Sequence, residues 1–293
     1  MKLRLRPRLF HLSLSLLSVV TLFSCERPII PTSSGGDDDG NLQVSVFQIE
    51  KIPFADAMSR AQASQVCNRL CFAVYDMTGK RVKQFNQKAD DTSFGTASFR
   101  LSAGKYQVVV VAHSSSGNPT MTNPAKIKFD NADGYSDTFL HTETVEITDE
   151  DEVDLSVQLE RIVALCRFVI TDDMPDGVDK LLFQYKGGSG AFDANTGLGC
   201  VNSTQKMSFD ADPQQKEYDL YTFLHDETGT IHLLVVAYDA NDNVMCEREF
   251  DVSLTRRSIT RFSGPYFTGG ASDPFSISVV INTDWENEYD VTF

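Results

Sequence analysis

Short runs in which apolar and polar residues alternate recur along this chain of 293 residues, and they restrict its fold more than any other feature. In the clearest run, every second residue from Val153 to Leu159 is apolar and the residues between them are polar. The same alternation recurs at residues 42–46 and 275–281. Because successive side chains of a β-strand point to opposite faces, this period is typical of strands with one buried face.

Turn residues between other apolar runs predict hairpins. The predicted hairpins are residues 72–75 with 82–85, turning at 76–79, and residues 99–101 with 106–112, turning at 103–104. Residues 108–111 and 233–236 are apolar without alternation, which predicts central strands that are buried on both faces. A helical spacing occurs at residues 54–64, after Pro53, and that stretch is too short to organise a core.

Short strands without intervening amphipathic helices indicate antiparallel β-sandwiches or barrels. A hydrophobic fraction of 41%, with 20 Phe and 9 Tyr, supplies side chains for buried cores, and the length suggests two domains. A weak internal echo agrees, because residues 72–82 parallel residues 235–244. We therefore predict an all-β fold of two tandem antiparallel β-sandwich domains, residues 41–160 and 161–293.

The N-terminus has the order of a bacterial lipoprotein leader. Four basic residues at positions 2–8 precede an apolar run from Leu9 to Phe23, which is too short for a bilayer-spanning helix. The run ends in Leu22-Phe23-Ser24-Cys25, which resembles a lipobox. We predict that residues 1–24 are a lipoprotein signal peptide and that Cys25 is lipidated, with palmitate among its acyl chains. An ordinary secretory signal with a chance cysteine is the alternative.

Residues 25–40 are rich in Pro, Ser, Gly and Asp, which predicts a lipidated flexible tether. The whole chain has 26 Lys and Arg against 41 Asp and Glu, and loss of the leader leaves 22 basic residues and a net charge of −19. This acidic balance disfavours nucleic acid as a partner and excludes attachment to an anionic membrane by charge. The predicted attachment to the membrane is therefore through the N-terminal lipid.

Apart from Cys25, the cysteines of the chain lack the paired C-x-x-C spacing of zinc and redox sites. They are Cys67, Cys71, Cys166, Cys200 and Cys246. Buried free thiols are the expected state. A bridge between Cys166 and Cys246 is an alternative, because each alternates in phase with apolar neighbours. A bridge between Cys67 and Cys71 would require a bend, since they lie about 13 Å apart along an extended strand.

Other polar clusters do not form a catalytic or metal-binding motif. The histidines of the body form no H-x-H or H-x-x-x-H pair, and His232 is expected on a strand face. Residues 187–190, Gly-Gly-Ser-Gly, lack the Lys-Ser/Thr of a phosphate loop, so a flexible hairpin loop is predicted. Residues 130–137 place Phe129 where an EF-hand needs its first carboxylate, so a solvated turn is predicted, with an irregular Ca²⁺ site as the alternative. We predict no catalytic residue, no metal, no cofactor and no enzymatic activity.

Two segments carry a family resemblance. Leu159-Glu160-Arg161-Ile162-Val163-Ala164 lies at the predicted junction, and residues 257–267 precede the strand at 275–281 and Asn282-Thr283-Asp284-Trp285. With the lipobox, this order resembles the Bacteroidales fimbrillin superfamily, and most closely the FimB/Mfa-type fimbrial anchor or accessory subunit lipoproteins. In that family an L-x-R-x-x-A element opens the second domain, and the last strands carry a T-x-x-x-G turn, here Thr260 to Gly264. The resemblance implies transthyretin-like sandwich domains.

The resemblance also implies a structural role in a fimbria, or pilus. The chain would be lipid-anchored in the cell outer membrane, exposed at the surface, and bound to fimbrial pilin subunits by strand complementation during pilus assembly and cell adhesion. The candidate donor strand places Phe275, Ile277, Val279 and Ile281 on one face. The alternative for this strand is a place in the core of its own domain.

A cell-surface carbohydrate-binding lipoprotein is the alternative function. Such a protein would present exposed aromatic rings, and Tyr135, Tyr185 and Phe192 in loop-like segments are the candidates for that platform. The family resemblance already explains the single tryptophan, Trp285, as a structural residue.

Overall fold

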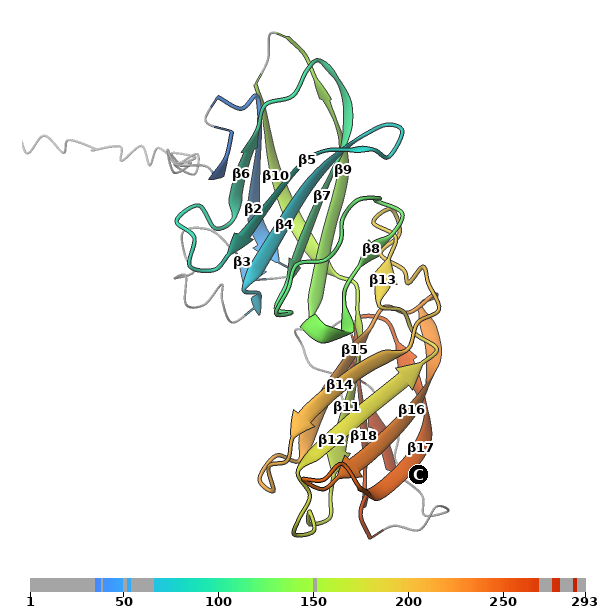
Figure 1. Cartoon of the computed structure of the whole chain (residues 1–293). Helices are drawn as coiled ribbons and strands as arrows, with labels where there is room; N and C mark the ends of the chain where they lie inside the picture. The colour runs from blue at the N-terminus through green and yellow to red at the C-terminus, as the bar shows by residue number, and fades with distance from the viewer. Residues whose placement is uncertain are drawn as a thin grey trace, which may run out of the picture. The chain divides into compact units, whose positions relative to one another are not determined.

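The alternating runs form the strands of an almost entirely β fold, seen here in a computed structural model (Figure 1). The structure describes residues 35–37, 39–49, 52–53, 66–149, 152–268, 276–279 and 287–288. All of them belong to one compact unit, residues 31–293. The predicted all-β class is confirmed. The stretch predicted as a helix, residues 54–64, lies outside the described residues.

Strands from the first half of the chain form one nine-stranded sheet around a core. Its order is β1 (Gly35–Gly36), β6 (Thr96–Phe99), β2 (Leu42–Ile49), β10 (Val153–Arg161), β9 (Thr138–Ile147), β7 (Gly104–His113), β4 (Arg69–Asp76) and β5 (Arg81–Lys88), with β3 (Ile52–Pro53) paired to β2. β10 changes partner along its length, because it pairs with β2 through Leu159 and with β9 at Glu160 and Arg161. The sheet thereby folds over a first core that includes Leu42, Phe72 and Leu159.

β4 and β7 lie at the centre of this sheet and are buried on both faces. Residues 108–112 of β7 have no exposed surface, which confirms the predicted central strand. One face of the pair contributes to the first core. The other face, including Cys71, Tyr75 and Val109, contributes to a second core that also contains Phe192 and Phe223 from the second half of the chain.

Two four-stranded paths form the second half. One has the order β15 (Glu217–Thr222), β11 (Ala164–Ile170), β18 (Ser258–Gly264) and β19 (Ser276–Val279), with β20 (Asn287–Glu288) also paired to β18; the other has the order β14 (Gln205–Asp210), β12 (Lys180–Lys186), β16 (Thr228–Tyr238) and β17 (Val244–Thr255). A third core lies between them and is rich in aromatic rings, with the ring centroids of Phe168 and Phe183 5.4 Å apart. β16 lies between β12 and β17, as predicted for residues 233–236.

Each half has one feature that the alternation did not predict: its first and last long strands are parallel neighbours. β2 pairs with β10 in parallel from Leu42 opposite Val153 to Ile49 opposite Leu159. β11 pairs with β18 in parallel from Leu165 to Ile170. A period of two fixes which residues share a face and leaves strand direction open. The antiparallel prediction therefore holds for most pairs, but not for these two or for the short pairs β1–β6 and β18–β20.

The strand pairing changes next to the predicted domain boundary. β10 ends at Arg161 and β11 begins at Ala164, and the two residues between them are buried. The main sheets on either side are separate, but β8 (Ile127–Lys128) pairs with β13 (Ala191–Phe192) across the boundary, and the second core draws on both sides. The division into domains at residue 161 therefore stays a prediction.

The internal echo corresponds to two hairpins of the same construction. In β4–β5 the register shifts between Val74 and Tyr75, and in β16–β17 it shifts between Ala237 and Tyr238. An aspartate follows each tyrosine and accepts hydrogen bonds from backbone amides in its turn, from residues 78 and 80 for Asp76. Asp239 does the same for residues 241 and 243. The hairpin predicted at 72–85 is confirmed.

Two sequence predictions of hairpins are wrong. Residues 99–101 and 106–112 do not pair, because β6 pairs with β2 and β1 whereas β7 pairs with β4 and β9. The chain between them crosses from one part of the sheet to another. The segment 187–190 connects β12 to β13 and is buried from Gly188 onwards, and Ser189 is fully buried and bridges Phe223. A Cβ on Gly188 would lie 2.0 Å from Thr222 Oγ1, so glycine serves close packing there.

Candidate functional site

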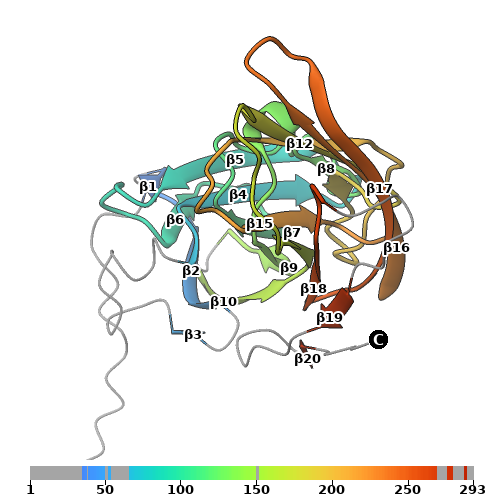
Figure 2. The same cartoon turned by 90° about the horizontal axis from the view of Figure 1, so that it is seen from below.

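The predicted donor strand lies beside β18 of its own chain. β19 pairs antiparallel with β18, with Ile277 opposite Phe262 and Val279 opposite Thr260, and β20 pairs in parallel with residues 258 and 259 (Figure 2). β11 occupies the other side of β18, so both C-terminal strands share one edge. Phe275, Ile281 and the lipidation residue Cys25 lie outside the described residues. The donor role of this segment stays a prediction.

β18 itself is firmly packed. Ser258, Ile259, Thr260 and Phe262 are each at most 5% exposed. The stretch Thr260 to Gly264, expected as a turn from the family resemblance, is strand up to its last residue, so that expectation is wrong. The strand continues because its backbone pairs on both sides, with β11 and with β19.

Asp172 fixes the chain just after β18 ends. Its carboxylate accepts hydrogen bonds from the backbone amides of Tyr266, Phe267 and Thr268 at 2.7–2.8 Å, and from the Thr268 hydroxyl at 3.0 Å. Burial acts to raise the pKa of Asp172, but these donors lower it below its usual value. Tyr266 is fully buried and donates its hydroxyl to the Val235 carbonyl. The chain is therefore held in place through Thr268, before the C-terminal strands begin.

The L-x-R-x-x-A element links all three cores. Leu159 lies in the first core, Ile162 and Val163 in the second, and Ala164 in the third. Arg161 is 7% exposed, and its guanidinium donates two hydrogen bonds of 2.7 Å to the carboxylate of Asp137. Burial raises the pKa of Asp137, and the bonds from Arg161 act in the opposite direction.

The second family segment meets this element in space. Arg257, in the turn before β18, donates from its backbone amide to the Val163 carbonyl at 2.9 Å. Its side chain donates to the Arg161 carbonyl and to the Glu160 carboxylate, both at 2.8 Å. Sequence reasoning identified both segments but treated them as separate signals, because residues 96 positions apart carry no local sign of contact.

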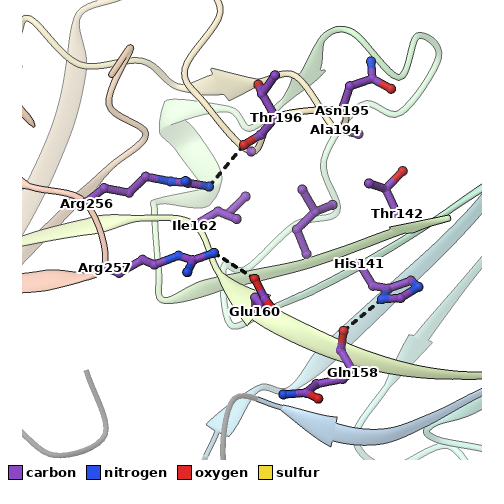
Figure 3. A pocket seen from close by; sticks show the side chains of 12 residues that line it. His141, Thr142, Gln158, Glu160, Ile162, Ala194, Asn195, Thr196, Arg256 and Arg257 are labelled. Atoms are coloured by element: carbon purple, nitrogen blue, oxygen red, sulfur yellow. Dashed lines mark hydrogen bonds and ion pairs between the residues drawn. The ribbon is translucent and has the colours of Figure 1, made fainter. Parts of the chain in front are cut away.

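A polar groove of about 270 Å³ lies beside this junction (Figure 3). The groove lies next to the short stretch in which β10 pairs with β9. There Nδ1 of His141 on β9 lies 2.9 Å from the carbonyl oxygen of Gln158 on β10. Arg256 and Arg257 line the other side, with Arg256 bonded to Glu227 and to the Thr196 carbonyl. The groove is open, and the polar groups named here bond mainly to one another, which is consistent with a structural role.

A cysteine and a histidine do lie together inside the second core. Cys71 Sγ lies 3.6 Å from His113 Nε2, and both residues are fully buried. Burial raises the pKa of Cys71 to about 12 and lowers the pKa of His113 to about 3. The thiol and the imidazole are therefore both neutral, whereas a catalytic pair needs a thiolate. The five cysteines among the described residues are free thiols, and Cys67, Cys71 and Cys166 are buried.

The other polar candidates have separate structural partners. Asp130 accepts from the amide of Ala132, Asp133 contacts Ser116, and Asp137 binds Arg161. His232 pairs across strands with Asp251 on an exposed face, as the strand prediction required. Across the described ranges, no three His, Cys, Asp or Glu residues gather to hold a metal ion.

The three aromatic candidates for the alternative, carbohydrate-binding function do not form an exposed platform. Tyr135, Tyr185 and Phe192 are 8%, 1% and 0% exposed, so their rings are not available to a sugar. Tyr185 lies on β12 and packs in the third core, whereas Phe192 on β13 and Tyr135 in a loop pack in the second core.

Comparison with known proteins assigns a family. Residues 37–293 match the model of DUF6562, described as a family of unknown function. The chain belongs to the DUF6562 family. No curated protein matches it in sequence. Within the part of this DUF6562 chain that the structure describes, no helix has the length and apolar character needed to span a bilayer.

Several solved structures are similar to this DUF6562 chain. A candidate adhesin from Bacteroides ovatus ATCC 8483 is 16% identical with a TM-score of 0.49, over 72% of this chain and 82% of that one. A candidate polysaccharide-binding protein from Bacteroides thetaiotaomicron VPI-5482 has the same identity and TM-score, over 80% and 95%. The fimbrial anchor protein Mfa2 from Porphyromonas gingivalis is 10% identical with a TM-score of 0.43, over 85% and 99%.

Proposed function

We propose that this protein is a structural subunit of a fimbria, held at the outer membrane by acyl chains on Cys25 and joined to pilin subunits through its C-terminal segment. The observation that carries the proposal is how that segment pairs. Among the residues that the structure describes, β19 and β20 pair with the edge of β18 at four and two positions. A strand held by so few pairs can exchange one sheet edge for another, and the edge of a pilin would offer the same backbone hydrogen bonds.

The Asp172 contacts support an exchange that is limited to the C-terminal segment. Because the amides of residues 266–268 are bonded to Asp172, the chain can release β19 and β20 while β18 stays in its sheet. The fold of the second half would then survive donation of the segment.

The position of the first long strand supports a place at the base of the fibre. β2 lies between β6 and β10, and Leu42, Val44 and Val46 are at most 3% exposed. Loss of β2 would open the first core and separate the rest of the chain from the lipid at Cys25. A subunit that keeps this strand can donate a strand but has no vacant site for one.

Truncation tests the donor role. Removal of residues 286–293 should weaken capture of pilins and leave a folded lipoprotein, whereas removal of everything from Phe275 should also destabilise the second half. Co-purification of pilins with the full-length and truncated chains measures capture. Unchanged capture by a folded chain that lacks the terminal segment would remove that segment from the donor role.

A matched pair of substitutions sharpens this test. Ile277→Asp places a charge on the predicted donor face, and Ser278→Asp places the same charge on the opposite face of the same strand. We expect pilin capture to fall with Ile277→Asp and to persist with Ser278→Asp. Equal capture by the two variants would contradict the assigned face.

The lipid anchor has its own test. Cys25→Ala should abolish incorporation of labelled palmitate and leave unprocessed or soluble protein. Cys200→Ala is the control, because Cys200 is a free and exposed thiol of the folded part and should not affect labelling. Equal incorporation in wild type and Cys25→Ala would place the anchor elsewhere.

A further inference from the structure

The parallel pairs β2–β10 and β11–β18 have a mechanical consequence. β2 is the first long strand of the chain and β10 the last strand before the junction, and they share seven register pairs. β11 is the first strand after the junction and β18 the last before the C-terminal segment, and they share six. Each pair therefore joins the two points at which its half of the chain begins and ends.

Strand direction decides how such a pair responds to tension. When force acts on the start of one parallel strand and on the end of its neighbour, the two strands are pulled past each other along their length. All of the hydrogen bonds between them then bear the force together. When force acts on the same end of both strands, the bonds break one after another. Tension between the N-terminus and the C-terminus loads both pairs in the first way.

Both outer ends of this line are fixed by a polar side chain. At the start of β2, the Asn41 carboxamide donates to the Leu101 carbonyl and accepts from the Leu101 amide, both at 2.9 Å. At the end of β18, Asp172 holds the amides of residues 266–268. The force would therefore act on each strand at a defined residue, and the end of the strand would not separate from its neighbour first.

The junction between the two pairs is also reinforced. The chain passes from β10 to β11 through Ile162 and Val163, and Arg257 bonds to residues 160, 161 and 163 around that passage. Arg257 belongs to the turn that leads into β18. The end of the first pair is thus connected to the second pair by side-chain bonds as well as by the backbone.

We propose that this protein bears tension between its N-terminal anchor and its C-terminal segment, with β2–β10 and β11–β18 acting as two shear-loaded clamps in series. The inference rests on the proposed function, which supplies the two points where force acts. Strands β3 to β9 lie between β2 and β10 in sequence, and β12 to β17 lie between β11 and β18, so these strands are shielded from the force until a clamp fails.

Single-molecule force spectroscopy on residues 26–293 tests this directly. In one geometry the handles are at the two chain ends. In the other, the second handle is a bio-orthogonal residue at exposed Glu152, which lies at the same end of the β2–β10 pair as Asn41. The two geometries differ in sequence only at the exposed residue 152, and hydrogen exchange of the two proteins before pulling verifies that both are folded.

We expect release of the short C-terminal strands first, and then unfolding at a force at least about twofold higher in the end-to-end geometry than in the Glu152 geometry, because the bonds fail together instead of singly. Equal or lower force in the end-to-end geometry would overturn the inference. The measurement needs no pilin. A chain that resists tension but captures no pilin would overturn the donor role alone, and a chain that captures pilin but unfolds readily would overturn only the clamps.

Discussion

Among the charged residues named above, Arg161 is the one whose substitution should lower the free energy of unfolding most. Its side chain is 8% exposed, its partner Asp137 is largely buried, and its guanidinium also lies 4.8 Å from the centre of the Phe139 ring. Arg161→Met would leave a buried carboxylate without its charged partner, for which we expect a loss of about 3 kcal/mol in the free energy of unfolding at pH 7. Chemical denaturation measures it.

Two comparisons separate this effect from a general loss of charge. Lys180→Met removes the partner of Asp242, which is 76% exposed, and should cost less than about 1 kcal/mol. The double variant Arg161→Met/Asp137→Leu should recover much of the loss, because no unpaired charge remains. A double variant as unstable as Arg161→Met would show that packing, and not the unpaired carboxylate, carries the cost.

The sequence identified Arg161 but not its partner. The motif Leu159 to Ala164 indicated a junction residue, whereas Asp137 was assigned to a solvated turn because oxygen-bearing residues cluster around Gly134. The two are 24 positions apart, and no periodicity reports a contact at that distance. The same holds for Arg257 and for Asp172, whose roles come from backbone groups brought near them by the fold.

His113 gives the protein a predictable response to acid. Burial lowers its pKa to about 3, against 6.5 for the free side chain, so the folded state keeps the imidazole neutral where the unfolded state takes up a proton. Its contribution to stability is thus complete above pH 6.5 and is lost as the pH falls from 6.5 towards 3. Between pH 7 and pH 5 the loss from this residue should be about 2 kcal/mol.

The variant His113→Phe isolates that contribution from the carboxylates that titrate in the same range. The free energy of unfolding is measured by denaturant titration at pH 7 and pH 5 for both proteins. We expect the wild type to lose about 2 kcal/mol more than the variant over this interval. Parallel losses in the two proteins would show that His113 is not the group responsible.

Among the elements, hairpins with their turn chemistry in the sequence were the most predictable. The β4–β5 and β16–β17 hairpins share a tyrosine, an aspartate that bonds to its turn, and the same register shift, and the sequence echo revealed them. The error at β6 and β7 has an equally physical reason. Ala103-Gly104 is a valid turn signal, but the burial pattern of Phe99 and of residues 108–112 is satisfied equally well in separate parts of the sheet.

Residues 188–190 show that a glycine-rich stretch can form a buried and closely packed connection. A Cβ on Gly188 would lie 2.0 Å from Thr222 Oγ1, and Thr222 is 1% exposed and bonded to Gln205. Gly188→Ala should therefore destabilise the protein by about 1–3 kcal/mol, because the buried Thr222 side chain cannot move freely away from the new methyl group. Gly229→Ala is the control, since its Cβ would meet only a Leu224 methyl, at 3.3 Å. Equal stability of the two variants by thermal unfolding would contradict the close packing.

At the scale of the whole molecule, the second core determines whether the two halves can exist apart. One face of the central sheet, with Cys71, Tyr75 and Val109, packs against Phe192 and Phe223. Separation would expose both sets of side chains to water, which is unfavourable in proportion to the apolar area exposed. The sequence placed a boundary near residue 161 from the change in strand pattern, and it had no means of showing that a core crosses that boundary.

We therefore expect the chain to unfold in one cooperative transition, with both halves opening together. Native-state hydrogen exchange read by mass spectrometry measures this, because amides of β7 and β16 should then exchange with the same free energy of opening. Residues 41–161 expressed alone should expose the Tyr75 face, bind a hydrophobic dye and aggregate, and co-expression with residues 162–293 should restore a soluble complex. Two unfolding transitions with different midpoints would contradict this expectation, and so would a first half that is soluble and does not bind the dye. Either result would show that the first and third cores suffice for folding and that the second core only docks two independent domains.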